Sequence, residues 1–167
     1  MKKKLKVAAV ILAGIFLLLQ LTNPARTNPP VKRDAIAAAN PPAAVAASLR
    51  AACYDCHSHE TKWPLYSRIA PSSWLVVADV NEGRKNFNLS EWPEEPARAA
   101  KKLDRINEVV DSREMPPKKY TALHPEARLT EEQRKASMTM RARESFCAAG
   151  MNSVWSICLF EKVFWRE

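Results

Sequence analysis

The stretch Cys53-Tyr54-Asp55-Cys56-His57 decides how this sequence is interpreted. In a C-x-x-C-H run, two thiols add across the two vinyl groups of one porphyrin, and the imidazole that follows lies beneath the iron as an axial ligand. The chain has only 4 Cys and 3 His, so few other groupings compete with this one. The stretch predicts one covalent haem c per chain, attached to Cys53 and Cys56, with His57 as the proximal iron ligand.

Two other interpretations of the same cysteines stay open. A thiol-redox pair prefers a strand–helix context, whereas residues 43–52, which precede the motif, are alanine-rich and helical in pattern. A zinc site would use Cys53, Cys56, His57 and His59, but four ligands this close in sequence would strain a tetrahedron. Haem is therefore the favoured cofactor, ahead of a zinc site and of a thiol-redox module.

The N-terminus indicates export. Residues 1–6 contain four lysines, and residues 7–21 form an apolar run broken only by Gln20. A basic region before an apolar run is typical of a secretory signal peptide or a signal anchor. The run is short against the roughly 20 residues of a spanning helix, and no A-x-A cleavage site follows it. We expect a protein of the bacterial periplasm, tethered to the inner membrane through residues 7–21; a cleaved signal and a soluble periplasmic protein are the alternative.

The net charge of +8 does not indicate a nucleic-acid-binding protein. Five basic residues and no acidic residue lie in the first 26 positions, so the rest of the chain carries only +3. No basic patch is interleaved with aromatic residues, as nucleic-acid binding would favour. We therefore expect no nucleic-acid partner, and the sequence does not identify the redox partner proteins.

Proline content and hydrophobic periodicity suggest how the chain is organised. Five prolines between residues 23 and 42 favour an extended tether. The expected parts are a signal peptide or signal anchor at 1–22, a proline-rich tether at 23–42, a haem-binding domain at 43–136 and an atypical C-terminal extension at 137–167. The extension holds Cys147 and Cys158, for which a disulfide is feasible in an oxidising compartment.

The haem-binding domain is predicted to be all-α, a small cytochrome c-like helical domain around one haem. Gly83 is the one glycine between residues 15 and 149, so tight hairpin turns are scarce and no strand is predicted. Prolines favour helix starts at Pro41-Pro42, Pro71 and Pro93. The capping-box pattern of residues 130–133 favours a fourth start.

Two of these helices have an expected face. The helix from Pro71 is predicted to end near Gly83, and it places four residues on one side: Trp74, Leu75, Ala78 and Glu82. The helix from Pro93 cannot continue past Glu114, because two prolines follow. Its apolar positions recur at three and four residues: Ala97, Ala100, Leu103, Ile106 and Val110.

The second axial position of the iron separates an electron carrier from an enzyme or a sensor. Met115, which precedes two prolines, is the favoured distal ligand, since a thioether raises the reduction potential and closes the iron to other ligands. Met115 filling a core gap is the alternative. His124 would give bis-His ligation, although a surface position suits it better. His59 lies too close to His57 in sequence to reach the opposite haem face.

Residues after the motif are candidates for the wall of a haem pocket. A porphyrin needs an apolar, aromatic crevice, and four aromatic residues suit one: Trp63, Tyr66, Trp74 and Trp92. Plain core packing explains these residues equally well. Arg68 and Arg84 are candidates for charge-assisted hydrogen bonds to the haem propionates.

Several of these residues together resemble a known family. The motif and the blocks Thr61-x-Trp63-Pro64, Ile69-Ala70-Pro71, Glu82-Gly83-Arg84 and Met115-Pro116-Pro117 are similar to the bacterial haem-binding domain family of small cytochrome c-like proteins. The resemblance covers residues 26–135, and the chain departs from the family pattern from Ser137 onward. It implies a c-type haem held by the two cysteines and the histidine of the motif, with Met115 as the distal ligand.

The predicted function is one-electron transfer by an exported monohaem c-type cytochrome-like protein, which is a carrier rather than an enzyme. Two alternatives remain. One is a haem-based sensor or peroxidase-like enzyme with an open distal site, and the other is a zinc or thiol-redox module. The axial ligand opposite His57 distinguishes the carrier from the sensor or peroxidase.

Overall fold

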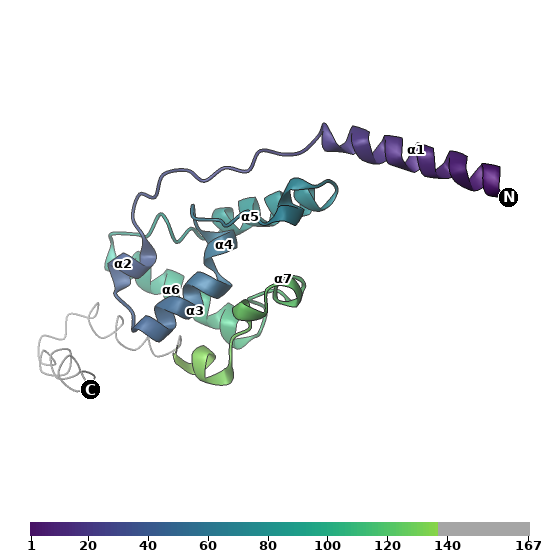
Figure 1. Cartoon of the computed structure of the whole chain (residues 1–167). Coiled ribbons are helices and arrows are strands. Elements are labelled where there is room, and N and C mark those ends of the chain that lie inside the picture. Colours follow the sequence, from purple (N-terminus) through teal and green to yellow (C-terminus); the bar gives the residue numbers. More distant parts are fainter. Residues whose placement is uncertain (137–167) are drawn as a thin grey trace, which may run out of the picture. The chain divides into compact units, whose positions relative to one another are not determined.

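The computed structural model describes residues 1–136, which are helical and contain no strand (Figure 1). The prediction of an all-α fold is confirmed for this part of the chain. The residues divide into two compact units. Among the described residues, unit 1 consists of residues 1–32 and 54–91, and unit 2 of residues 33–53 and 92–136. The expected extension at 137–167, with Cys147 and Cys158, lies outside the described residues.

Each unit is assembled from segments that are distant in sequence. The elements of unit 1 are α1 (Lys2–Gln20), α4 (Tyr54–His57), the 3-10 helix η1 (Leu65–Arg68) and α5 (Ser72–Asn86). The elements of unit 2 are α2 (Ala35–Ala39), α3 (Ala43–Ala52), α6 (Pro96–Asp111), α7 (Lys118–Leu123), the 3-10 helix η2 (Pro125–Ala127) and a helical segment at 131–136. The residues expected to form one haem-binding domain, 43–136, therefore contribute to both units.

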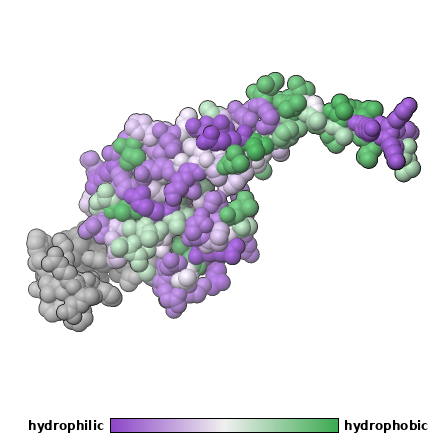
Figure 2. Space-filling view, viewed as in Figure 1, coloured by the Kyte–Doolittle hydropathy of each residue, from purple (hydrophilic) through white to green (hydrophobic). Residues whose placement is uncertain are grey.

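Helix α1 exposes its apolar side chains along its whole length, and its lysines gather at the N-terminal end (Figure 2). None of its residues is buried. Within the described residues, no helix combines the length and the apolar character that crossing a membrane requires.

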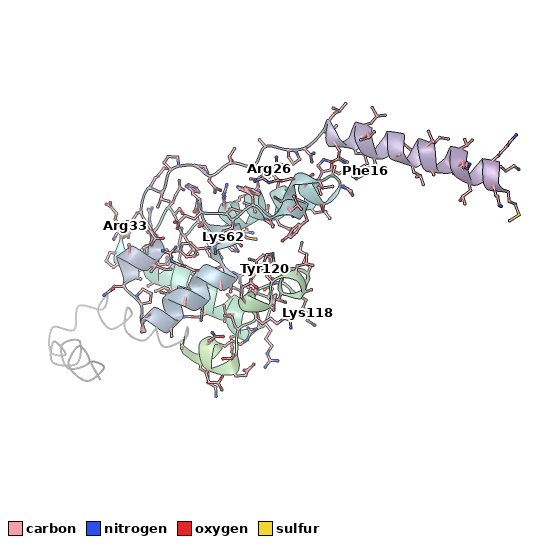
Figure 3. All side chains as sticks on the ribbon, in the orientation of Figure 1. Phe16, Arg26, Arg33, Lys62, Lys118 and Tyr120 are labelled. Carbon is pink, nitrogen blue, oxygen red and sulfur yellow. The ribbon has the colours of Figure 1, made fainter. Side chains whose placement is uncertain are left out.

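The segment after α1 is extended and hydrogen-bonded to the rest of unit 1. The Gln20 side-chain amide pairs with both backbone groups of Ala70, at 3.0 and 3.3 Å. Ser73 donates to the Asn23 side chain. Arg26, labelled in Figure 3, donates to the Ser67 carbonyl at 3.3 Å. The sequence predicted an extended tether from residue 23, and it gave no sign of these bonds.

Helix α5 begins after Pro71, as predicted, but Gly83 lies inside it rather than at its end. The predicted shared face is the solvent-exposed one: Leu75 is 68% exposed and Trp74 37% exposed. The buried residues are Ser73, Val77, Val80 and Gly83. The four predicted residues do share one face, and the sequence did not indicate that it is the exposed one, because two of the inward positions are the small residues Ser73 and Gly83.

Helix α6 starts at Pro96, three residues after the predicted start, with proline in its first turn, where the missing N–H costs nothing. It ends at Asp111, ahead of the two prolines, as expected. Its buried residues are Ala99, Leu103, Ile106, Asn107, Val109 and Val110. Asn107 was not predicted to be among them, because a period search counts only apolar residues.

The capping box predicted at residues 130–133 is confirmed. The Gln133 N–H donates to Thr130 Oγ1 at 3.2 Å, and the Thr130 N–H donates to Gln133 Oε1 at 2.8 Å. These reciprocal bonds satisfy donors that a helix start otherwise leaves unpaired. The helical segment that begins here is joined to α6, since Arg134 donates to the Val110 carbonyl at 2.6 Å.

Candidate functional site

His57 is buried at the end of α4, and one ring nitrogen is fixed by two carbonyl groups. Its Nδ1 lies 2.9 Å from the Gly83 oxygen and 3.2 Å from the Phe87 oxygen. Because both partners are acceptors, Nδ1 carries the proton, and the lone pair of the neutral ring is on Nε2. No hydrogen bond to Nε2 occurs among the described residues. This tautomer is the one that ligates a metal through Nε2.

The surroundings of His57 also favour the neutral form of its ring. Burial lowers the pKa of His57 below its ordinary value, while the hydrogen bonds to the Phe87 and Gly83 carbonyls oppose this effect. The Phe87 ring stacks on the imidazole, with centroids 3.9 Å apart and planes at 8°. Hydrogen bonds and stacking thus fix the ring orientation, and desolvation disfavours the imidazolium that cannot bind a metal.

Gly83 brings α5 against the C-x-x-C-H stretch. A Cβ at this position would lie 2.5 Å from the Cys56 carbonyl oxygen and 3.3 Å from Cys56 Cβ. Real Cβ atoms do not approach a backbone oxygen so closely, so any side chain here would push α4 away from α5. The glycine therefore has two roles: it permits the contact of the two helices, and its carbonyl orients His57.

Arg84 stabilises the chain on either side of this contact. Its guanidinium donates to the Ser58 oxygen at 2.7 Å and the Thr27 oxygen at 2.9 Å. It also donates to Thr61 Oγ1 at 2.9 Å and Asn28 Oδ1 at 3.0 Å. Burial lowers the pKa of Arg84 below its ordinary value, whereas the electrostatic interaction with Cys56 raises it. The structure therefore uses this residue, a candidate for propionate binding, to join the loop after the motif to the N-terminal segment.

His59 belongs to a separate buried network. Its Nδ1 bonds the Pro30 oxygen at 2.9 Å, and its Nε2 bonds the Asn88 side-chain amide at 2.7 Å. The His59 N–H donates to Ser90 Oγ at 2.8 Å. Both ring nitrogens are therefore engaged, so His59 has no nitrogen to offer to a zinc ion. This finding removes one ligand from the alternative zinc site.

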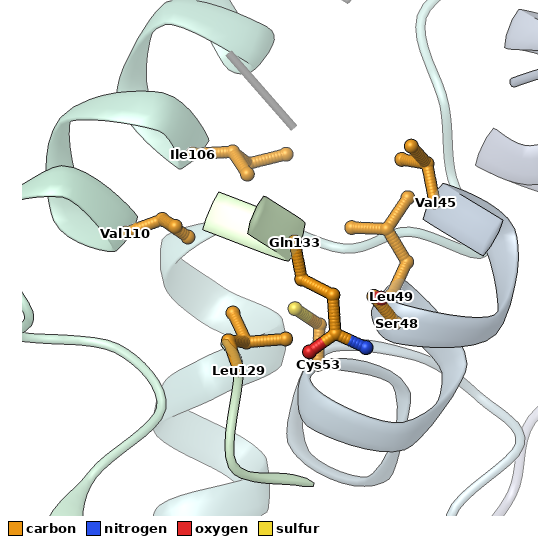
Figure 4. Close-up of a pocket in the computed structure, with 8 residues that line it drawn as sticks. All are labelled: Val45, Ser48, Leu49, Cys53, Ile106, Val110, Leu129 and Gln133. Carbon is orange, nitrogen blue, oxygen red and sulfur yellow. The ribbon is translucent and has the colours of Figure 1, made fainter. Parts of the chain in front are cut away.

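Cys53 caps the C-terminus of α3 and lines a pocket of unit 2 (Figure 4). The walls come from α3, from α6 and from the segment after η2, and most of them are apolar: Val45, Ser48, Leu49, Ile106, Val110, Leu129 and Gln133. Cys53 and Cys56 are both half-buried. A thioether at Cys53 would thus leave its porphyrin edge beside an apolar surface.

Met115 lies in a loop that is held on the end of α6. Its N–H donates to the Val109 oxygen at 2.9 Å, and its side chain is half-buried. In the same loop Arg113 has a positive φ of 60° and forms an ion pair of 2.8 Å with Glu131. These contacts fix the backbone from which the Met115 side chain extends.

His124, the alternative distal ligand, is occupied in local contacts. Its Nδ1 lies 3.0 Å from Glu126 Oε1, and its ring stacks on Tyr120 with centroids 4.3 Å apart. Its side chain is only 17% exposed, so it is not the surface histidine that the sequence suggested. The stacking of the His124 ring on Tyr120 of α7 accounts for its burial.

The candidate aromatic residues do not share one environment. Trp63 donates to Asn28 Oδ1 at 3.2 Å, and Trp74 donates to the Thr22 oxygen at 3.1 Å, so both fasten the N-terminal segment. Tyr66 is half-buried, and its carbonyl accepts from Ser72. Trp92 is buried in unit 2. Arg68 is exposed on η1.

Sequence reasoning missed Phe87 as a neighbour of the motif. No spacing rule relates a residue thirty positions away to a histidine ligand. Its position at the end of α5, one turn after Gly83, places its carbonyl beside the Gly83 carbonyl on His57. Only the contact of α4 with α5 reveals that role.

A haem group fits what these residues offer. His57 presents an unengaged Nε2 with the proton fixed on Nδ1, two cysteines lie within four residues of it, and an apolar pocket adjoins Cys53. A thioether-linked porphyrin needs each of these features. Such a site can hold iron for electron exchange, and with an open sixth position it can admit a small ligand.

Comparison with known proteins agrees with this chemistry. Over 101 residues the chain is 31% identical to a cytochrome c peroxidase, Ccp, of Escherichia coli (strain K12), in a match that includes 55% of this chain. The chain spans about a fifth (21%) of that relative. No solved structure matches. A family model described as "Haem-binding domain" matches residues 14–141, which is most of the chain. The protein belongs to the haem-binding domain family.

Proposed function

We propose that this protein is an exported c-type haem protein that transfers single electrons. Cys53 and Cys56 would form the two thioether bonds, and His57 Nε2 would bind the iron. The observation that carries the proposal is the hydrogen bond from His57 Nδ1 to the Gly83 oxygen, directly after a C-x-x-C pair. It sets the tautomer that an iron ligand needs, on the residue that the motif requires.

The residues of the chain have defined tasks in this function. Bound haem supplies an iron that accepts and returns one electron. Gly83 and Phe87 orient the proximal ligand, and the apolar residues beside Cys53 exclude water from the porphyrin edge. Met115 is the distal ligand in this proposal, and it lies on a loop that is held by the bond to Val109 and by the ion pair of Arg113 with Glu131. Its thioether would favour the reduced iron and exclude other ligands.

A peroxidase-like enzyme is the second candidate function. The similarity to a cytochrome c peroxidase favours it, although the chain spans only a fifth of that protein. Catalysis of this kind requires a sixth iron position that peroxide can reach. The two functions therefore differ at the distal ligand, and they share the same attachment.

Export would place the domain in the bacterial periplasm. The support is the basic stretch at residues 1–6 followed by the exposed apolar surface of α1. Residues 7–21 would serve as a signal that is removed or, although α1 falls short of the length and apolar character of a spanning helix, as a membrane anchor. Redox partner proteins would dock from the same compartment.

The pyridine haemochrome spectrum of protein exported through a cytochrome c maturation system tests the proposal. We expect the spectrum of a haem with two saturated vinyl groups, at one haem per chain. The spectrum of a haem with intact vinyl groups, or stoichiometric zinc without haem, would contradict it. Retention of the haem through acid–acetone extraction is an independent readout of the covalent bonds.

A further inference from the structure

Exposed apolar side chains of unit 1 gather in one short segment, residues 65–75, which includes η1 and the start of α5. Between residues 32 and 136, every exposed large apolar side chain except Leu123 lies in this segment: Leu65, Ile69, Trp74 and Leu75. Ser72 Oγ joins the two elements, since it donates to the Tyr66 oxygen at 2.6 Å. A single exposed leucine is ordinary, but a group of such side chains marks a surface that a partner covers.

The C-terminal end of α1 is bonded to the same segment. The Gln20 side chain pairs with both backbone groups of Ala70, and the Trp74 indole N–H donates to the Thr22 oxygen at 3.1 Å. Leu21, directly after α1, is 82% exposed, and α1 exposes its apolar side chains along its length. The exposed apolar surface of the segment therefore begins where that of α1 ends.

The parts of the chain that meet here are basic. Neither residues 1–33 nor residues 61–78 contain Asp or Glu. Arg68 is exposed within the segment, and Arg26 is fixed beside it by a bond of 3.3 Å to the Ser67 oxygen. Anionic phospholipid headgroups attract arginine, and the boundary between headgroups and acyl chains favours exposed leucine and tryptophan. The charge and the apolar character of this surface thus both suit a lipid bilayer.

We propose that residues 65–75 form a membrane-contacting surface, which inserts its four exposed apolar side chains among the headgroups of a bilayer that contains anionic lipids. This inference rests on the exported location within the proposed function. It does not require α1 to span the membrane, because the segment supplies its own apolar and basic side chains. The bonds between Gln20 and Ala70 keep α1 beside the same surface for as long as α1 is part of the chain. Unit 1 would then lie on the membrane rather than at the end of a flexible tether.

Photochemical labelling from the lipid tests the proposal. The exported, haem-loaded chain is added to vesicles of phosphatidylglycerol and phosphatidylethanolamine that carry a diazirine on the acyl chain, close to the headgroup. Trypsin cleaves after Lys62, Arg68 and Arg84, so the segment is recovered in peptides 63–68 and 69–84. We expect lipid adducts on both peptides. Peptide 120–128, which contains the exposed Leu123, should carry far fewer. Equal labelling of all three would show that adducts follow exposure alone, and it would overturn the proposal.

Leu75→Glu tests the surface within the full chain. Leu75 is 68% exposed, so a carboxylate there should leave the fold and the haem content unchanged while it removes the adducts from peptide 69–84. The matched control is Leu123→Glu, at a leucine that is 65% exposed, and it should leave those adducts unchanged. Replacing phosphatidylglycerol by phosphatidylcholine should lower the yield of adducts. Adducts at full yield in Leu75→Glu, or an equal yield on neutral vesicles, would contradict the proposal.

The outcomes separate this inference from the function on which it rests. Protein recovered only from the cytoplasm would refute export, before any labelling is done. Exported, haem-loaded protein without adducts on residues 63–84 would refute only the membrane-contacting surface. A dimer in analytical ultracentrifugation that Leu75→Glu converts to monomers, without lipid adducts, would show that a second copy of the chain covers the segment, and the proposal would be wrong.

Discussion

The surroundings of His57 and those of Met115 are built by different means. The imidazole of His57 is held by hydrogen bonds to the Gly83 and Phe87 carbonyls and by stacking on the Phe87 ring. Gly83, which has no side chain, lets α5 lie directly against the Cys56 backbone. Around Met115, a hydrogen bond from its N–H to the Val109 oxygen and the ion pair of Arg113 with Glu131 hold the loop backbone, and no hydrogen bond orients the half-buried side chain within the described residues. The difference teaches that the protein orients the ring of His57, the proposed proximal ligand, whereas at Met115, the proposed distal ligand, it fixes only the backbone.

Gly83→Ala is the substitution expected to have the largest effect on the His57 region. The new methyl group would collide with the Cys56 carbonyl, so α4 would have to move and the bond to His57 Nδ1 would weaken. We expect a loss of roughly 3 kcal/mol in unfolding free energy and reduced haem incorporation. Thermal unfolding and haem content measure both effects.

Gly14→Ala is the matched control for that substitution. Gly14 is also helical, but nothing lies within 4 Å of a Cβ placed there. Alanine should leave the melting temperature unchanged or raise it slightly, because it favours the helix. If the two alanine variants had equal stability and equal haem content, the contact at Gly83 would not be what preorganises His57.

Arg84→Lys should have the next largest effect. A lysine keeps the charge but cannot reach the four acceptors that the planar guanidinium bonds. We expect a loss of about 2 kcal/mol, measured by denaturant unfolding, and faster proteolysis of the N-terminal segment. Arg105→Lys, at an arginine with a single exposed ion pair, should change neither quantity. Equal behaviour of the two variants would show that Arg84 does not stabilise unit 1.

Met115→Ala tests the other half of the comparison. We expect the oxidised protein to lose its weak near-infrared sulfur-to-iron band, to bind carbon monoxide and to have a lower reduction potential, because the thioether favours the reduced iron. Its stability should fall less than that of Gly83→Ala, since the contacts of His57 are intact. Leu123→Ala, at an exposed apolar residue of α7, is the control and should leave the spectrum unchanged.

The wild-type protein provides the decisive contrast for Met115. If it already lacks the near-infrared band and binds carbon monoxide readily, Met115 is not a ligand. The open sixth position would then favour the peroxidase-like function.

Thr130→Ala should have the smallest effect. It removes the side-chain acceptor of the capping box, which costs about 1 kcal/mol, and it should loosen the segment whose Arg134 bonds the end of α6. Hydrogen exchange of residues 131–136 measures the loosening, and the spectrum of the haem should not change. Thr121→Ala, at a half-buried threonine whose hydroxyl donates to the Lys118 oxygen within its own helix, is the control. A spectral change in Thr130→Ala would mean that the capping box also positions the loop that contains Met115.

The sequence predicted what local rules determine and missed what depends on tertiary contacts. The C-x-x-C-H stretch, the prolines before α3 and α5, and the capping box at Thr130 each act over a few residues, and a haem-binding all-α protein followed from them. The inner face of α5 was not predicted, because the small residues Ser73 and Gly83 form part of it. Phe87 was missed because its partner, His57, lies in another element, and the burial of Asn107 was missed because a search for hydrophobic periodicity counts only apolar residues.

Mass mapping of the exported protein tests the central claim most directly. Trypsin cleaves after Arg50 and Lys62, so one peptide, residues 51–62, contains both cysteines of the motif. Our account predicts that this peptide carries the mass of one haem, bound through both sulfur atoms, and that neither thiol reacts with an alkylating reagent. The same peptide recovered without haem, with two thiols that alkylate or with a disulfide between them, would contradict it.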